Sequence, residues 1–375
     1  MLWIDDEWTE ERTSQAQLAL INQKSTGVAP NEFWIQKYKT SGAKYWHEFY
    51  KRNKTNFYKD RHYLQVVFPE LDYICDSTSN VAYHSNDTNQ ILKLMEVGCG
   101  VGNAVLPLLE LNPRLEIHAI DFAKSAIELL NTEINSDGNS KYNVISSDDM
   151  EIDTEIETET VLNTTINKRI TATVCDITKD LLPVEENSMD LILCMFVISA
   201  IAPEHMEKAF QKLFCALKPG GKLLFRDYGR YDEAQMRFSN KNRLEDNFYV
   251  RQDGTCAYYF EDTQLVSLLC GTNSSGSATG SSGTNSSTCS GITGGSSGGG
   301  LGLESVPDAP LETVFNAAMN METNTNNTNT NMSSTATGVG FKCEECYYIH
   351  RQYANRNQKK VRFRVWVHGK FVKPK

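Results

Sequence analysis

Residues 94–103 read Leu94-Met95-Glu96-Val97-Gly98-Cys99-Gly100-Val101-Gly102-Asn103, an apolar stretch that runs into three closely spaced glycines. A helix-length interval follows, and then a second apolar stretch, 115–120, ends at Asp121. This order of strand, glycine-rich turn, helix and strand with a carboxylate at its tip is typical of the first half of a nucleotide-binding sheet. Glycines let a ligand approach the backbone, and the carboxylate is placed to accept hydrogen bonds from ribose hydroxyls. The pattern therefore predicts a nucleoside-bearing cofactor.

The spacing of the glycines favours S-adenosylmethionine (SAM) among the nucleoside cofactors. A Gly-x-Gly turn alone suits NAD, FAD and SAM alike, but Gly98, Gly100 and Gly102 do not follow the GxGxxG spacing of dinucleotide sites. Glu96 lies inside the first strand, two residues before the glycines, as is common in methyltransferases. Asp176 follows a later apolar stretch and is a candidate acceptor for an adenine amino group, with a helix N-cap as the alternative.

The central part of the chain alternates apolar strands with helical segments. We expect strands near 92–97, 115–120, 169–175, 189–195 and 222–227, and helices near 102–110, 123–134 and 203–217. Such alternation predicts an α/β fold with a mostly parallel sheet covered by helices on both faces. The stretch 361–367 resumes strand alternation near the C-terminus, and we expect it to complete the sheet with Arg362 and Arg364 on one face.

Composition divides the chain into segments. Residues 1–30 lack periodicity and are expected to be loosely ordered, whereas 31–85 are rich in aromatic and basic side chains. The core is assigned to 86–270, with an acidic insertion at 135–168, and 271–338 is a Gly/Ser/Thr/Asn low-complexity insertion. Neither insertion has enough apolar surface to order itself, so both are expected to be disordered. Residues 339–375 are expected to supply the last strands and a basic surface.

The net charge of -10 conceals strong segregation of charge. Residues 37–62 carry eight Lys and Arg against two acidic residues, and 341–375 carry ten against two, whereas 132–160 carry nine acidic residues against one lysine. Because phosphate binding depends on local potential and not on net charge, the two basic flanks are compatible with a nucleic-acid partner. Ordinary solvated surfaces are the alternative.

The remaining composition points to the interior of the cell. No apolar run approaches the ~20 residues of a membrane span, and the acidic start argues against a targeting peptide. Ten scattered cysteines are typical of reduced thiols. We expect a cytoplasmic protein, with the nucleus as the alternative. Cys343 and Cys346 form a single pair with His350 nearby, which falls short of the roughly four ligands of a zinc site, so we predict no metal.

Five separated motifs resemble the tRNA N3-methylcytidine (m3C) methyltransferases. They are Tyr45–Tyr50 with Asn56–Leu64 and Phe68–Leu71, then Glu96–Asn103, Phe225–Asp232, Glu245–Thr255 and Arg364–Pro374. The resemblance covers roughly 33–270 and 341–375, apart from the acidic insertion. The C-terminal motif is similar to the branch that acts on threonine and arginine tRNAs.

The resemblance implies a class I SAM-dependent methyltransferase with a Rossmann-like, seven-stranded sheet, which methylates N3 of a cytidine at the 5′ edge of the tRNA anticodon loop. The implied SAM-binding residues are Trp46, Tyr50, Gly98, Gly100, Asp121, Asp176, Ile177 and Met195. Trp46 and Tyr50 share one helix face, and they would close over SAM as a lid; core packing is the alternative. The implied RNA-binding residues are Lys59, Arg61, His62, Arg362 and Arg364.

The chemistry agrees with this implication. Cytidine N3 carries a free lone pair at neutral pH, so the reaction needs an exposed Watson–Crick edge and good orientation and no strong base. Because the product is a cation, Asp227 is our candidate for a stabilising carboxylate, Tyr228 for stacking on the base, and Arg226 for holding a phosphate or orienting Asp227. A structural ion pair between Arg226 and Asp227 is the alternative.

The expected partners are tRNA and, as for some family members, an aminoacyl-tRNA synthetase or another accessory protein, with no membrane. The chain would act as a monomer or in a partner-dependent complex. Two other functions stay open at this point. One is a methyltransferase acting on a protein or a small molecule, and the other is a catalytically silent RNA-binding subunit.

Overall fold

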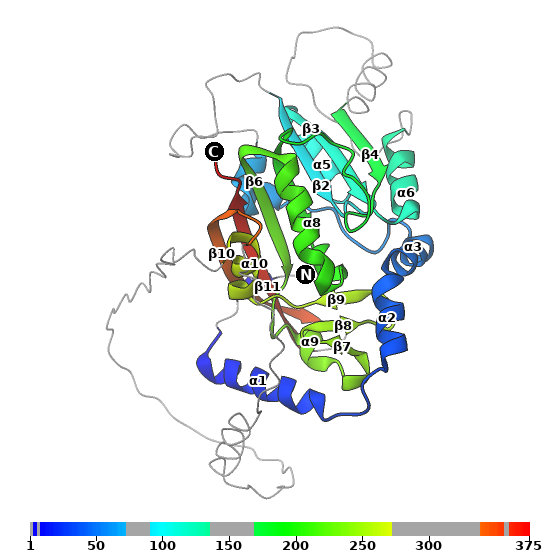
Figure 1. The fold of residues 1–375 in the computed structure, drawn as a ribbon, viewed down its shortest axis with the longest axis vertical. Helices are drawn as coiled ribbons and strands as arrows, with labels where there is room; N and C mark the ends of the chain where they lie inside the picture. Colours follow the sequence, from blue (N-terminus) through cyan, green and yellow to red (C-terminus); the bar gives the residue numbers. More distant parts are fainter. Residues whose placement is uncertain (1–2, 6–7, 73–90, 136–168, 272–337, 356–359) are drawn as a thin grey trace, which may run out of the picture. The chain divides into compact units, whose positions relative to one another are not determined.

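The computed structural model describes residues 3–5, 8–72, 91–135, 169–271, 338–355 and 360–375 (Figure 1). These residues belong to one compact unit, formed by Met1–Ser274 together with Thr337–Lys375. The acidic and low-complexity insertions, 135–168 and 271–338, fall almost entirely outside the described residues.

The described residues form an eight-stranded sheet. Its strands are β1 (Trp3–Asp5), β2 (Leu92–Val97), β3 (Leu115–Asp121), β4 (Ile170–Val174), β5 (Met189–Met195), β6 (Leu217–Tyr228), β10 (Lys342–Asn355) and β11 (Lys360–Val372), in the order β1-β10-β11-β6-β5-β2-β3-β4. Strands β4, β3, β2, β5 and β6 are parallel, and β11, β10 and β1 run antiparallel beyond them. The five core strands and the C-terminal strand are confirmed, and β1 is an eighth strand that we did not expect.

Helices cover both faces of the sheet (Figure 1). One face packs on α5 (Val105–Leu111), α6 (Lys124–Ile134) and residues 64–71, which comprise α4 (Leu64–Val67) and a 3-10 turn (Pro69–Leu71). The other packs on α8 (Pro203–Ala216) and α10 (Asp262–Cys270). Strand β2 packs against helices on both of its faces, since Leu94 faces α5 while Met95 and Val97 face α8, as expected for a strand buried on both sides.

The prediction of a loosely ordered N-terminus was wrong for the described part of that segment. Helix α1 (Glu10–Lys24) begins at Thr9, whose side chain accepts from the Arg12 amide. In its last turn, the buried side-chain amide of Gln23 donates to the carbonyl oxygens of Gln235 and Phe238, each at 2.8 Å. The sequence lacks a clear apolar period here because one buried polar side chain anchors the helix.

The segment that precedes the core forms α2 (Glu32–Thr40) and α3 (Gly42–Asn53). The Ser125 hydroxyl donates to the His47 carbonyl oxygen at 2.9 Å and ties α3 to α6. Helix α2 packs on a small second sheet, β7 (Arg243–Glu245), β8 (Phe248–Val250) and β9 (Cys256–Tyr258), which follows α9 (Glu233–Arg237). Both helices therefore lie over the carboxyl ends of the parallel strands, where ligands bind in open α/β sheets.

Candidate functional site

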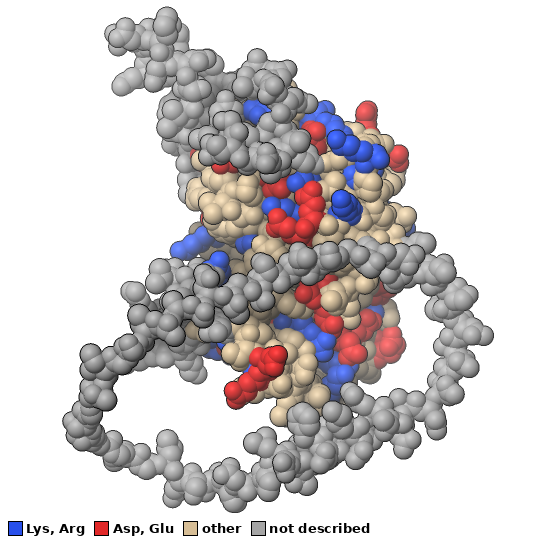
Figure 2. Space-filling model, turned by 90° about the vertical axis from the view of Figure 1, so that its left-hand side faces the viewer, with Lys and Arg blue, Asp and Glu red and all other residues tan. Residues whose placement is uncertain are grey.

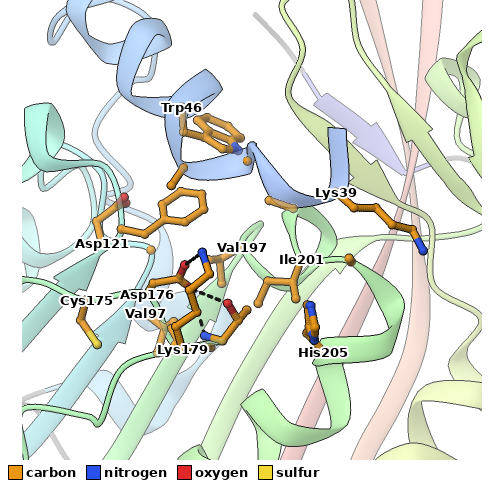
Figure 3. A pocket seen from close by; sticks show the side chains of 18 of the residues that line it. Lys39, Trp46, Val97, Asp121, Cys175, Asp176, Lys179, Val197, Ile201 and His205 are labelled. Carbon is orange, nitrogen blue, oxygen red and sulfur yellow. Dashed lines mark hydrogen bonds and ion pairs between the residues drawn. The ribbon is translucent and has the colours of Figure 1, made fainter. Parts of the chain in front are cut away.

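A cavity of about 450 Å³ lies at the carboxyl ends of the parallel strands (Figure 3). Its floor comes from the turn after β2, the tip of β3, residues 175–179 and the segment 196–205. Helices α2 and α3 form its roof, and Trp46 lies above the cavity with Asp121 and Asp176 below (Figure 3). The cavity brings together six of the eight predicted SAM residues, namely Trp46, Tyr50, Gly98, Asp121, Asp176 and Ile177.

The glycine turn is closely packed from two sides. Gly98 has φ +67°, and a Cβ there would lie 2.3 Å from Cγ2 of Val197. Gly100 has φ +56°, and a Cβ there would lie 2.6 Å from the hydroxyl oxygen of Tyr50. Left-handed φ values and absent side chains are both required for this approach. Although Gly100 does not line the cavity, its backbone is in close contact with the Tyr50 side chain of α3.

Asp121 is fixed by the turn that it faces. One carboxylate oxygen accepts from the Gly100 amide at 2.9 Å and the other from the Ala123 amide at 2.8 Å. Burial raises the pKa of Asp121 to about 6, although these two backbone amides offset part of the effect. Each oxygen retains a further lone pair, which suits a carboxylate that accepts from two vicinal hydroxyls.

Trp46 and Tyr50, the predicted lid residues, belong to an aromatic cluster with Phe49 on α3. The centres of the Trp46 and Tyr50 rings are 6.0 Å apart, and both side chains line the cavity. The Trp46 indole Nε1 is buried and has no hydrogen-bond partner among the described residues. Buried donors in proteins normally have an acceptor. A donor that lacks one beside a cavity is therefore consistent with a polar ligand that supplies the acceptor.

Lys39 holds the roof to the floor. Its side chain is 8% exposed, and its ammonium donates to Glu204 in the first turn of α8 at 3.0 Å and to Glu245 on β7. Figure 3 shows Lys39 at the edge of the cavity, on the side of His205. This ion-pair group connects α2 to two elements that are more than 160 residues away in the sequence.

Asp176 lies where the predicted adenine acceptor is expected, and the helix N-cap alternative is wrong, because a turn and not a helix follows it in the described residues. It lines the cavity, and its carboxylate also accepts from the amide and the hydroxyl of Thr178, at 3.0 and 2.6 Å, and pairs with Lys179 at 2.9 Å. Burial alone would raise the pKa of Asp176, but these bonds outweigh it and hold the pKa below its usual value.

Met195 differs from the prediction, because its side chain is buried in the hydrophobic core on the α5 face and does not line the cavity.

A second group of side chains adjoins the cavity through Phe196. This residue directly follows β5, has φ +59°, and lines the cavity. The centre of its ring is 5.2 Å from that of Tyr228, and the guanidinium of Arg61 lies 5.7 Å from it. Two more guanidiniums, from Arg251 and Arg364, lie 5.4 and 5.2 Å from the Tyr228 ring. A strained backbone at a non-glycine residue between two such groups is typical of functional sites.

Asp227 and Arg226 point away from each other, so the structure shows neither the expected orienting contact nor an ion pair between them. Asp227 is fully buried and accepts from the Ser199 amide at 3.0 Å and from the Tyr228 amide at 2.8 Å. Burial raises its pKa to about 6. Its role is to fix the 198–200 turn behind Phe196. Arg226 is 6% exposed and donates to Nδ1 of His368 at 3.2 Å on the opposite face of the sheet.

Apart from Arg61, which lies by Phe196, the predicted RNA-binding residues divide into two groups. Lys59 and His62 are exposed and line a separate surface cavity beside the glycine turn. Arg362 and Arg364 instead have internal partners, because Arg362 pairs with Glu233 and Arg364 pairs with the buried Asp232 at 2.7 Å.

Much of the C-terminal basic flank is neutralised in the same way. Lys370 pairs with Glu70 and Glu345 at 3.4 and 3.2 Å, and Lys373 donates to the carbonyl oxygens of Phe214 and Leu217 at the end of α8. On the side of the molecule that carries β10 and α10, blue and red side chains are intermixed (Figure 2). Four of the basic side chains expected to form a surface on 339–375, those of Arg362, Arg364, Lys370 and Lys373, therefore have partners within the described residues.

Among the described residues, no group of three His, Cys, Asp or Glu side chains is placed to hold a metal ion. Cys346 donates to the carbonyl oxygen of Asp262 at 3.7 Å, and burial raises the pKa of both Cys343 and Cys346. No helix in the described ranges is long and apolar enough to cross a membrane.

Sequence reasoning missed Phe196, Val197, Lys39, Glu204 and Arg251. The position of Phe196 and Val197 directly after a core strand was an available signal, because ligands bind at the carboxyl ends of such strands. No local pattern marks the other three, whose partners lie far away along the chain.

Comparison with known proteins identifies the family. Residues 95–223 match the methyltransferase domain family. The Drosophila melanogaster tRNA N(3)-methylcytidine methyltransferase Mettl2 is 34% identical over 271 residues, 71% of this chain and 71% of the relative. The human tRNA N(3)-cytidine methyltransferase METTL6 is 38% identical over 244 residues, 64% of this chain and 72% of the relative.

The Saccharomyces cerevisiae tRNA(Thr) (cytosine(32)-N(3))-methyltransferase is 37% identical over 269 residues, 70% of this chain and 36% of that longer relative. Among solved structures, a SAM-dependent methyltransferase from Methanosarcina mazei covers 76% of this chain and 94% of its own at 15% identity and a TM-score of 0.42, which is too low to add to the assignment. The fold is that of a class I SAM-dependent methyltransferase, and the chain belongs to the family of tRNA N(3)-cytidine methyltransferases.

Proposed function

We propose that this protein transfers a methyl group from SAM to N3 of a cytidine in the anticodon loop of tRNA. Phe196 carries the proposal, because it is both a wall of the SAM-sized cavity and a member of the adjoining aromatic and arginine group. A base bound beside Phe196 would lie next to the SAM cavity, so that its acceptor nitrogen could face the methyl group.

The residues present fit SAM. Asp121 would accept from the ribose hydroxyls, Asp176 and Ile177 would border the adenine, and Gly98 leaves room for the methionine end. Trp46 and Tyr50 would close the roof, and they exclude water from the reacting atoms. Bound SAM supplies an electrophilic methyl group on its sulfonium.

The acceptor needs orientation more than proton transfer. The N3 lone pair forms the new N–C bond as the C–S bond breaks, the electron pair stays on sulfur, and S-adenosylhomocysteine leaves. No proton moves, and the base becomes cationic. Stacking on Tyr228 and Phe196 would position the base after it leaves the RNA stack. The two rings already lie against guanidiniums, so they would orient the base and not offset its charge. Asp227 is enclosed and contributes only through the 198–200 turn.

The finer assignment concerns the substrate and its surroundings. The relative from Saccharomyces cerevisiae is named for cytosine 32 of threonine tRNA. We infer the same position and isoacceptor for this chain, with arginine tRNA as a further substrate, and contacts from Lys59, Arg61 and His62 to the RNA backbone. A cytoplasmic or nuclear location and an accessory protein such as an aminoacyl-tRNA synthetase belong to the same proposal.

Methyl transfer from labelled SAM to unmodified threonine tRNA, followed by nucleoside analysis, tests the proposal. The expected product is N3-methylcytidine alone. Label in a protein or a small molecule, with tRNA unlabelled, would favour the other methyltransferase class. Binding of SAM and tRNA without any transfer would favour a silent RNA-binding subunit.

A further inference from the structure

An open groove of about 700 Å³ lies beside the site, between the end of α3 and the turn that joins β8 to β9. The α3 side contributes Arg52 and Phe57, the region of α9 contributes Arg237 and Phe238, and the turn contributes Arg251 and Asp253. None of these residues belongs to the cavity assigned to SAM.

The groove is strongly basic. Three arginines line it against one carboxylate, that of Asp253, which is already engaged by the Thr255 amide and hydroxyl at 3.0 and 2.7 Å. Arg52 has no ion-pair partner among the described residues, and Arg237 has only a distant one, Glu233, at 3.8 Å. Two guanidiniums are therefore available to bind phosphate in the forked geometry that arginine favours.

The groove also presents an aromatic face. The Phe57 side chain is 57% exposed, and its ring is held against that of Phe49 with centres 4.8 Å apart. An exposed phenyl ring that is fixed by a buried one provides a platform for stacking. Aromatic platforms between basic side chains are characteristic of single-stranded nucleic-acid sites, because every base offers a π-face while the phosphates need cations.

Arg251 connects this groove to the reaction site. Its guanidinium lines the groove and also lies 5.4 Å from the centre of the Tyr228 ring. Its position is fixed by hydrogen bonds to the Thr255 hydroxyl at 3.2 Å and the Cys256 carbonyl oxygen at 3.1 Å. A strand of RNA whose target base reaches Tyr228 would therefore continue past Arg251 into the groove.

We propose that this groove binds the loop nucleotides next to the target cytidine as a single strand, with a base on Phe57 and phosphates on Arg52 and Arg237. The assignment rests on the proposed tRNA substrate. The groove is a separate surface that contributes to tRNA affinity and does not contribute to SAM binding.

Binding of the full-length protein to unmodified threonine tRNA at about 0.1 M salt tests the assignment. The double variant Arg52→Glu/Arg237→Glu should raise the tRNA Kd more than tenfold, and Phe57→Ala should raise it about tenfold, the scale of one lost base stack. The salt dependence should fall, with the slope of log K against log salt reduced by about 1.4 for two lost single-strand contacts. The SAM Kd should stay within twofold, which also shows that the variants are folded.

The matched control is Lys208→Glu/Lys342→Glu, which reverses two exposed charges outside the groove and the SAM cavity. A tRNA Kd equal in the groove variant and this control would overturn the groove assignment, even if wild type forms m3C. If wild-type protein neither binds nor methylates tRNA, the proposed function itself fails, so the two failures are distinguishable.

Discussion

Substitution of Gly100 by alanine tests the contact between the glycine turn and α3. The new Cβ would lie 2.6 Å from the Tyr50 hydroxyl oxygen. A left-handed backbone costs an ordinary residue about 1–2 kcal/mol, and forcing atoms into a packed site costs a further ~1–3 kcal/mol. Relief requires a shift of the buried Tyr50 side chain, which lines the roof of the cavity and is packed against Phe49 on α3. We expect the SAM Kd to rise about 30-fold or more, equivalent to ~2 kcal/mol.

The second substitution, Tyr50→Phe, separates these two costs. Without the hydroxyl, the nearest ring atom is Cζ, at 3.4 Å from the Cβ position of residue 100, an ordinary van der Waals contact. The double variant should therefore retain only the backbone cost and recover about 1–3 kcal/mol of SAM affinity relative to Gly100→Ala alone. Gly27→Ala is the matched control, because Gly27 also has a left-handed φ, +81°, lies outside the SAM cavity, and a Cβ there would meet nothing within 4 Å.

Isothermal titration of SAM into the four proteins of this cycle and the control gives the coupling directly. Additive effects of Gly100→Ala and Tyr50→Phe, within about 0.5 kcal/mol, would refute the reasoning. Such a result would mean that the Tyr50 side chain does not contact the turn when SAM binds.

Three further perturbations test other parts of the account. Lys39→Met should speed SAM dissociation about tenfold in stopped-flow fluorescence by releasing the roof, whereas an unchanged rate would show that Glu204 and Glu245 do not hold it closed. The SAM Kd should rise about tenfold between pH 7 and pH 5, because ribose hydroxyls donate to ionised Asp121, whose pKa of about 6 means that it becomes protonated in this range. The variant Asp121→Asn should bind SAM weakly, with a Kd that does not depend on pH. A pH dependence that persists in this variant would assign the effect to another group. Arg364→Gln should lower the free energy of unfolding in urea by about 3 kcal/mol, since it leaves buried Asp232 without its cation. A loss of tRNA affinity at unchanged stability would restore the RNA-contact role.

The parts of the fold that were predictable from sequence are those set by neighbouring residues. The apolar run 94–97, the glycines and Asp121 specify strand, turn and strand locally, and the structure places them as expected. Alternation in 361–367 likewise identified the strand that pairs with β6. A continuous apolar run indicates a strand buried on both faces, and alternation indicates a strand buried on one face, so a short segment is enough to identify either.

The errors arose where a side chain meets a partner far along the chain. Arg364 looked like an exposed cation because Asp232, its partner, is 132 positions away. Asp227 looked available because its neighbours in sequence did not reveal that Ser199 encloses it. The same holds for Lys39 in the roof, whose two carboxylates come from α8 and β7. A charge count along the sequence therefore includes cations, such as Lys39 and Arg364, that the fold pairs with distant carboxylates.

The central claim is that N3 of one loop cytidine accepts the methyl group beside Phe196. A tRNA(Thr) anticodon stem-loop with cytidine at position 32 can be compared with the same RNA carrying 3-deazacytidine there, in which a C–H group replaces N3 and the shape is kept. We predict single-turnover methylation of the first RNA, and no methylation of the second despite a similar Kd. Methylation of the deaza RNA at that nucleotide, or of neither RNA while both bind, would contradict the account.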